Sequence, residues 1–232
     1  MPRFLQKKIV EIKQRVLAIG TLCEEQTRDA LKAVATRDVE LAERVMVGDK
    51  EIDIMEIDLE EECLNCLALH QPVAFDLRYV VAVLKMNNDL ERIGDLAKSL
   101  AGQARALAGE AEAIEMPFDL RAMGLRVERM LRYALDSVVN IDVEQAREVR
   151  VLDDEVDIMH AGTYRRAAEL MREHPHQIEQ MIHYLNVSRQ LERIADHACN
   201  VAKDVLYITE GEIPRHRRLQ KQRDAETADG DD

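Results

Sequence analysis

The sequence predicts an all-α fold of six long helices, arranged as two repeated three-helix bundles. Apolar residues recur three or four positions apart, as at Ile9, Ile12 and Val16, which is the helical period. The composition, 47% hydrophobic but only 3% aromatic, is dominated by aliphatic residues and favours helices. Residues 90–97 (LERIGDLA) and 191–198 (LERIADHA) are identical at six of eight positions. This internal repeat indicates that one helical unit has been duplicated.

The first unit is predicted to span residues 1–109. Asp38 is a favourable residue for a helix N-cap, and Pro72 suits the first turn of a helix, where its missing N–H costs nothing. Together with the apolar periodicity, these two residues mark predicted helix starts. The three predicted helices run from Arg3 to Ala35, from Asp38 to Leu69 and from Pro72 to Ala108.

The second unit is predicted to span residues 118–210, after a linker at 109–118 that interrupts the helical pattern with a glycine and a proline. Asp142 opens a D-x-x-Q capping box and follows Asp38 at a distance of 104 residues. The predicted helices run from Asp119 to Asn140, from Asp142 to Glu173 and from His176 to Glu210, with His174 and Pro175 in a turn. Residues 211–232 are predicted to form a charged flexible tail.

The charge balance excludes one class of partner. The formal net charge is −13 and the isoelectric point is about 5.1, whereas nucleic-acid binding requires a Lys/Arg surface that replaces counterions. An acidic surface suits cations or basic protein patches instead. There is neither a signal-peptide core nor an apolar stretch of membrane-spanning length, so we expect a cytoplasmic protein.

Carboxylates at a spacing of four residues are the candidate functional groups. This spacing places both side chains on one helical face, and two such faces on adjacent helices bring four carboxylates together. Oxygen ligands of this kind suit a divalent cation. The candidate metal ligands are Asp49 with Asp53, Glu91 with Asp95, Asp153 with Asp157, and Glu192 with Asp196.

Two explanations of these pairs remain open. The chain has 45 acidic residues in 232, so single pairs arise by chance, and Arg92 and Arg193 lie at salt-bridge spacing from Asp95 and Asp196. Recurrence at equivalent places in both units favours metal clusters over solvated acidic faces. Three neighbouring side chains belong to the same question. His160 and Glu56 are candidate further ligands, but a solvated helix face explains both more simply. His197 is interpreted as a packing or supporting residue.

Other chemistry has little support in the sequence. No nucleophile stands beside a base in a recognisable catalytic motif, and there is no G-x-x-x-x-G-K phosphate loop. Cys63 and Cys66 form a C-x-x-C without a second pair of zinc ligands, so we expect two buried thiols. We therefore predict that the protein is not an enzyme; the alternatives are a metal-dependent enzyme with a carboxylate-bound cluster and a purely structural helical scaffold.

Three motifs are specific to a known family: LERIGD at 90–95, LERIADHA with Asn200 in the second unit, and QPVAFDLR at 71–78. They resemble motifs of the PhoU family, the accessory proteins of bacterial phosphate-specific transport systems. The resemblance covers nearly the whole chain. It implies a PhoU-like fold of two three-helix bundles, and it identifies the four carboxylate pairs as metal motifs. Leu96 and Ser99 depart from the family pattern, because His197 and Asn200 stand at the matching places of the second unit.

The resemblance also implies a function and partners. A protein of this family would be a homodimeric negative regulator of phosphate uptake and of the phosphate-starvation (Pho regulon) response. It would act as an adaptor between the ATPase of a phosphate ABC transporter and a sensor histidine kinase, reaching the membrane only through these partners. The implied cofactors are divalent or iron-type metal ions, such as Fe, Zn, Mn or Mg, at the E/D-x-x-x-D clusters.

Overall fold

A computed structural model describes residues 3–110, 114, 116 and 118–211, and these residues form six long α-helices and no strand. The prediction of an all-α fold with two three-helix bundles is therefore confirmed. The helices are α1 (Arg3–Thr36), α2 (Val39–His70), α3 (Ala74–Ala108), α4 (Leu120–Asn140), α5 (Val143–Glu173) and α6 (Ile178–Glu210), with a short 3₁₀ helix, η1 (Pro175–Gln177), before α6.

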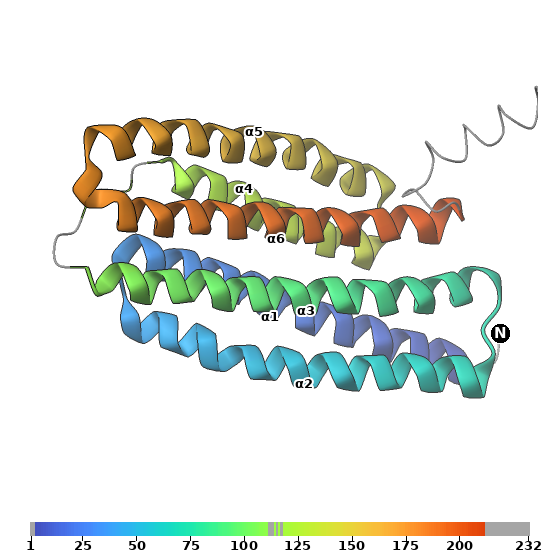
Figure 1. The fold of residues 1–232 in the computed structure, drawn as a ribbon. Helices are drawn as coiled ribbons and strands as arrows, with labels where there is room; N and C mark the ends of the chain where they lie inside the picture. Colours follow the sequence, from blue (N-terminus) through green and yellow to red (C-terminus); the bar gives the residue numbers. More distant parts are fainter. Residues whose placement is uncertain (1–2, 111–113, 115, 117, 212–232) are drawn as a thin grey trace, which may run out of the picture.

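The two bundles lie side by side with their helices running along one common direction (Figure 1). Helices α1, α2 and α3 pack against one another in the first bundle, and α4, α5 and α6 do so in the second. The bundles meet through α3 and α6, which share the most extensive helix–helix contact, and through α1 and α4. Consequently α2 and α5 are the outer helices of the molecule (Figure 1).

Aspartate caps begin three of the helices. The Asp38 carboxylate accepts a hydrogen bond of 2.9 Å from the Leu41 N–H, and Asp142 accepts bonds from two N–H groups in the first turn of α5. Asp119 accepts one such bond, from the Ala122 N–H in the first turn of α4. These bonds satisfy donors that have no partner inside the helix. The predicted caps at Asp38 and Asp142 are thus confirmed.

Two helices begin two residues later than predicted, at the turns that contain proline. Gln71 adopts a left-handed conformation (φ 45°) that closes α2, and Val73 is extended, so α3 starts at Ala74 instead of Pro72. In the second bundle Pro175 starts η1, and α6 follows from Ile178 instead of His176. Proline is accepted in the first turn of a helix, but the residue before it is pushed out of the helical region.

Paired glycines join the two bundles. A Cβ on Gly20 would lie 2.1 Å from a methyl carbon of Leu135, and a Cβ on Gly124 would lie 1.9 Å from one of Leu31. Gly124 and Leu135 each lie 104 residues after Gly20 and Leu31. The contact between α1 and α4 is therefore the same knob-in-hole contact made twice, as expected from a duplicated unit.

Several further predictions concern the core and the chain ends. Cys63 and Cys66 are free and buried, as predicted. The apolar stretches of the described helices are all too short or too interrupted by charge to cross a membrane. Gly211 closes α6 in the left-handed conformation (φ 73°), and the rest of the predicted tail, 212–232, lies outside the described residues, as do 111–113, 115 and 117 of the predicted linker.

Candidate metal centres

The first candidate centre is a groove of about 550 Å³ between α2 and α3. Three of the four predicted ligands line it: Asp53 from α2, and Glu91 and Asp95 from α3. Glu56 and Glu60, one and two helical turns further along α2, line the same groove. The groove therefore carries five carboxylates, and its polar lining is completed by Asn87, Asn88 and Arg92.

The fourth predicted ligand, Asp49, is held by a cation of the protein itself. Its side chain is only 2% exposed, and its Oδ2 atom lies 2.6 Å from Nζ of Lys98 on α3. This hydrogen bond raises the pKa of Lys98. A Cβ at Gly94 would lie 3.4 Å from the Asp49 carboxylate and 2.9 Å from Ile52, so the absence of a side chain there allows α3 to approach α2.

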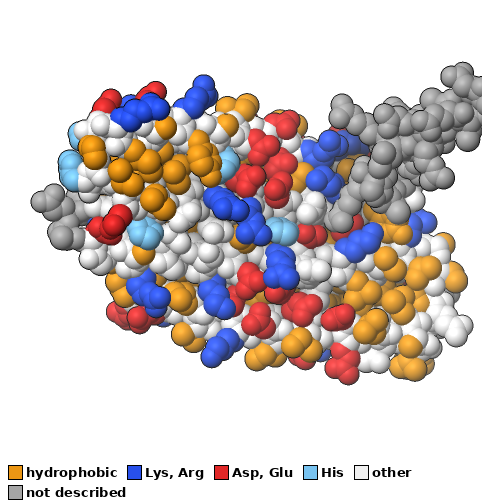
Figure 2. Space-filling view, in the orientation of Figure 1, with side chains coloured by type: hydrophobic (Ala, Val, Ile, Leu, Met, Phe, Trp, Pro, Cys, Tyr) orange, Lys and Arg blue, Asp and Glu red, His pale blue; other side chains and the backbone are white. Residues whose placement is uncertain are grey.

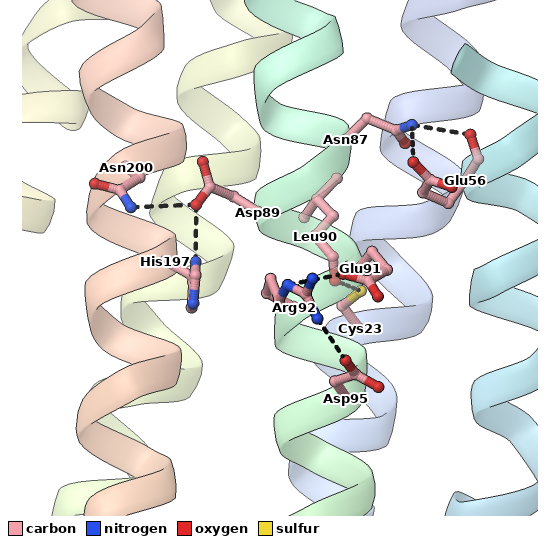
Figure 3. Close-up of polar contacts among 10 residues, drawn as sticks. All are labelled: Cys23, Glu56, Asn87, Asp89, Leu90, Glu91, Arg92, Asp95, His197 and Asn200. Atoms are coloured by element: carbon pink, nitrogen blue, oxygen red, sulfur yellow. Dashed lines mark hydrogen bonds and ion pairs between the residues drawn. The ribbon is translucent and has the colours of Figure 1, made fainter. Parts of the chain in front are cut away.

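A buried amide lies at the wall of this groove. The Asn87 Nδ2 group donates hydrogen bonds of 2.9 Å to the carbonyl oxygen of Glu56 and 3.2 Å to its carboxylate (Figure 3). Because both partners are acceptors, they determine which end of the amide is the nitrogen. The Asn87 Oδ1 atom is buried and finds no hydrogen-bond donor within the described part of the chain.

Burial and like charges act together on the groove carboxylates. Burial is the main cause that raises the pKa of Glu91, while the neighbouring carboxylates of Asp95, Glu56 and Asp53 raise it further and Arg92 lowers it. Arg92 lies 3.0 Å from Asp95 and 3.3 Å from Glu91 (Figure 3). The salt bridge considered as an alternative explanation of Asp95 is therefore formed.

The second candidate centre gathers the four remaining predicted ligands between α5 and α6. Burial raises the pKa of Asp153, whose carboxylate is hydrogen bonded to the Cys199 thiol, and the charges of Asp196 and Asp157 raise it further. Burial likewise raises the pKa of Glu192, again with contributions from Asp196 and Asp157. The four carboxylates are thus close enough to repel one another. Unlike Arg92, Arg193 makes no ion pair with the aspartate three residues later within the described structure.

His160 lies beside this second centre on α5. Its Nδ1 atom is 2.8 Å from the hydroxyl oxygen of Ser188, and its ring meets the Tyr164 ring edge-on at 5.1 Å. Burial lowers the pKa of His160, and the nearby Asp157 raises it. The contact with Ser188 orients the ring, so the other ring nitrogen is a candidate metal ligand.

His197 and Asn200 form a contact between the two bundles. They do not link the candidate ligands within one centre. Both contact the same oxygen of Asp89 on α3, at 2.8 Å from His197 Nδ1 and 3.1 Å from Asn200 Nδ2 (Figure 3). Of the two interpretations of His197, this contact favours a packing residue between the bundles, because Asp89 is not among the candidate ligands. In the first unit the equivalent residues are Leu96 and Ser99, which carry no comparable pair of donors, so the contact is made in one direction only.

Both centres offer the donors of a cation site, but their side chains are not gathered around one point. In the side-chain positions described, no three His, Cys, Asp or Glu residues are arranged to hold a metal ion. The chemistry of the donors nevertheless fits a divalent cation: several carboxylates repel one another in each centre, and a buried amide oxygen without a donor borders the first. Binding would require carboxylate side chains to rotate inward.

Sequence reasoning did not find Lys98, Asn87 or Asp89. Asn87 precedes Glu91 by four residues on α3, so its place on the ligand face could have been read from helical spacing. The partnership of Lys98 with Asp49 depends on how α2 and α3 are placed side by side, and that of Asp89 with α6 depends on how the bundles meet. Neither has a signal in local spacing.

Comparison with known proteins identifies the family. The PhoU domain matches twice, at residues 16–104 and 120–205. The phosphate-specific transport system accessory protein PhoU homolog of Pseudomonas aeruginosa is 35% identical over 217 residues, covering 94% of this chain and 90% of that protein. The PhoU protein of Escherichia coli K12 is 31% identical over 209 residues, covering 90% and 86%.

Solved structures agree with the fold. The crystal structure of PhoU from Pseudomonas aeruginosa has a TM-score of 0.86 at 35% identity, covering 89% of this chain and 99% of that chain. The phosphate transport system regulatory protein PhoU from Streptococcus pneumoniae has a TM-score of 0.82 at 28% identity, covering 90% and 98%. The matching proteins carry the names of accessory and regulatory proteins, which confirms the prediction that this chain is not an enzyme. The chain belongs to the PhoU family.

Proposed function

We propose that the protein is a negative regulator of phosphate uptake and of the phosphate-starvation response, acting in the cytoplasm as a homodimeric adaptor. In this role it links the ATPase of a phosphate ABC transporter to a sensor histidine kinase and keeps the kinase inactive when phosphate is plentiful. The observation that supports this most is the match of both repeats to the PhoU domain, together with relatives named as accessory proteins of the phosphate-specific transport system.

The shape of the molecule suits an adaptor. The two bundles share a long interface through α3 and α6 and a symmetric glycine contact through α1 and α4, and this interface holds the outer helices α2 and α5 at opposite edges of the molecule (Figure 1). The outer helices α2 and α5 carry half of the candidate ligands, and each candidate centre opens beside one of them. A partner that docks on either helix would therefore contact a carboxylate cluster.

Metal binding at the two clusters is the second part of the proposal. The residues that would hold a cation are Asp49, Asp53, Glu91 and Asp95 in the first unit and Asp153, Asp157, Glu192 and Asp196 in the second. A divalent or iron-type ion would supply positive charge that offsets the repulsion among these carboxylates. The protein's own part is to keep the carboxylates on facing helices and to orient His160 and Asn87 beside them.

Deleting the gene tests the regulatory role. In phosphate-rich medium we expect a phosphate-regulated reporter, such as alkaline phosphatase, to rise at least tenfold, because the kinase would no longer be held inactive. Expression of the wild-type chain from a plasmid should return the reporter to its low level. A reporter that stays low in the deletion strain would refute the regulatory proposal, whatever the protein binds.

Elemental analysis tests the metal part separately. Protein purified without chelators should contain at least about one transition-metal or divalent ion per chain. A variant in which Asp53, Glu91, Asp157 and Glu192 are changed to the corresponding amides should lose these ions. Less than a tenth of an ion per wild-type chain would contradict the metal proposal while leaving the regulatory proposal standing.

A further inference from the structure

Helix α2 carries a stripe of exposed apolar side chains on its outer face. Val47, Ile54, Ile57 and Leu64 are each between 52% and 67% exposed. Their spacing of seven, three and seven residues places them at a and d positions of a heptad repeat, where side chains form one seam along a helix. The two remaining positions of this seam are occupied by the exposed, oppositely charged residues Lys50 and Glu61. Figure 2 shows hydrophobic and acidic side chains next to one another along the lower edge of the molecule, where α2 lies in Figure 1.

This stripe is separate from the apolar face that α2 gives to its own bundle. Ile52, Leu59 and Cys66 are completely buried, and they recur every seven residues on the side of the helix opposite the stripe. The helix therefore has one apolar face for its core and a second that the described fold does not cover. From Val47 to Leu64 the stripe extends about 26 Å at 1.5 Å per residue, enough for a partner helix of several turns.

Acidic residues flank the stripe on both sides. In this register Glu51 and Asp58 occupy e positions, and Asp53 and Glu60 occupy g positions. These are the positions that choose a coiled-coil partner. The Arg15 guanidinium comes within 3.9 Å of Asp58. Within the described residues, neither Glu51 nor Glu60 makes an ion pair.

We propose that the outer face of α2 binds a basic amphipathic helix of a partner protein, with apolar residues at its a and d positions and Lys or Arg at its e and g positions. Such a helix buries the stripe and places its cations against the flanking carboxylates. A second copy of α2 is a poor occupant, because carboxylates would then face carboxylates along both flanks. The regulatory proposal above does not depend on this surface.

The second bundle provides a matched comparison. Val151 and Ile158 on α5 are exposed and equivalent to Val47 and Ile54, but the equivalents of Ile57 and Leu64 are Ala161 and Ala168. On α5, two of the four apolar side chains are therefore reduced to the methyl groups of alanine. We assign the helix-binding face to α2 alone, and α5 offers exposed isoleucine for a control substitution.

The test uses a designed peptide as the probe. A fluorescent 21-residue peptide has three heptads with Leu at a and d and Lys at e and g; one control peptide has the same composition in scrambled order, and another has Glu at e and g. Fluorescence anisotropy should show that the heptad Lys peptide binds the full-length protein at least tenfold more tightly than either control. Equal binding of the scrambled peptide would mean that only net charge is recognised, and would overturn the proposal.

Substitutions locate the site. Ile54→Ser combined with Leu64→Ser should weaken binding of the heptad Lys peptide at least tenfold, while Ile158→Ser on α5 should leave it unchanged; circular dichroism and the melting temperature show that each variant is folded. Unchanged binding in the α2 variant would refute the assignment. So would sedimentation showing that the α2 variant turns a wild-type dimer into a monomer, since the occupant would then be a second copy.

Discussion

The two candidate centres have kept their carboxylates through the duplication but not the residues around them. In the first centre Lys98 holds Asp49, whereas in the second the equivalent of Lys98 is Cys199, a thiol that shares a hydrogen bond with Asp153. An ammonium cancels one negative charge of the first centre. Among the described residues, no cation is hydrogen bonded to the four carboxylates of the second centre, and Lys203 acts on Asp153 through its charge alone.

The donors added to each centre differ as well. The first has Glu56 and Glu60 where the second has His160 and Tyr164. An all-oxygen set favours hard cations such as Mg²⁺ or Mn²⁺, whereas a set containing imidazole also suits Zn²⁺ or Fe²⁺. The comparison teaches that a repeated E/D-x-x-x-D motif defines where a cation would sit, and that neighbouring residues decide which cation it is.

The largest expected effect is on metal preference. Asp53→Asn with Glu91→Gln should reduce Mn²⁺ binding more than tenfold and leave Zn²⁺ binding nearly intact, because it removes carboxylates from the all-oxygen centre only. Asp157→Asn with Glu192→Gln should do the reverse. Isothermal titration calorimetry with each metal measures both effects. If both variants lost the two metals equally, the centres would not differ in the way their neighbours indicate.

The next prediction distinguishes the charge of Lys98 from that of a bound metal ion. Lys98→Ala should destabilise the metal-free protein by about 2 kcal/mol, because the buried Asp49 carboxylate loses its hydrogen-bonded partner while water still reaches the partly exposed lysine site. Urea unfolding measures this change in the free energy of unfolding.

A matched control is Cys199→Ala at the equivalent place in the second bundle, which should cost less because it removes a neutral hydrogen-bond partner. Millimolar Mn²⁺ should recover part of the stability of Lys98→Ala. A Lys98→Ala protein as stable as the wild type would show that the ammonium does not offset the Asp49 charge.

A smaller effect concerns pH. Burial raises the pKa of Asp153 and of Glu192 above their values in the unfolded chain, so the folded state binds protons more readily than the unfolded state. These groups therefore destabilise the metal-free fold increasingly as pH rises through their folded pKa, and protonation below it removes this destabilisation.

The matching measurement is the melting temperature of chelator-treated protein between pH 5 and pH 8. Asp153→Asn with Glu192→Gln should melt a few degrees above the wild type at pH 8, and this gap should narrow towards pH 5. A gap that widened at low pH would have the wrong sign for carboxyls with raised pKa values.

Features that depend on residues close in the sequence were easier to predict than features that depend on contacts between helices. The helices, the caps at Asp38 and Asp142 and the duplication were predicted correctly, because they depend on spacing within one helix or on self-similarity. The starts of α3 and α6 were placed two residues early, because the turn conformations before Ala74 and Ile178 are not encoded by the prolines alone.

The candidate centres were predictable only in part. Helical spacing placed Glu91 and Asp95 together with Asp53 in one groove. It could not indicate that Asp49 turns to Lys98, because the register between α2 and α3 depends on the close approach that Gly94 allows. Nor could it indicate that Asp89 pairs with His197, because that contact exists only once the two bundles have met.

The smallest expected effect probes the buried amide of the first centre. Asn87 is equivalent to Ser188 in the second bundle, so Asn87→Ser exchanges one centre's residue for the other's. The substitution removes two hydrogen bonds to Glu56 and the Asn87 oxygen that lacks a donor, and these changes oppose each other in the free energy of unfolding. We expect a net loss of about 1 kcal/mol and an affinity for Mn²⁺ lowered roughly fivefold, with Zn²⁺ unaffected. Unaltered Mn²⁺ binding would show that the amide supports Glu56 without contributing to the cation site.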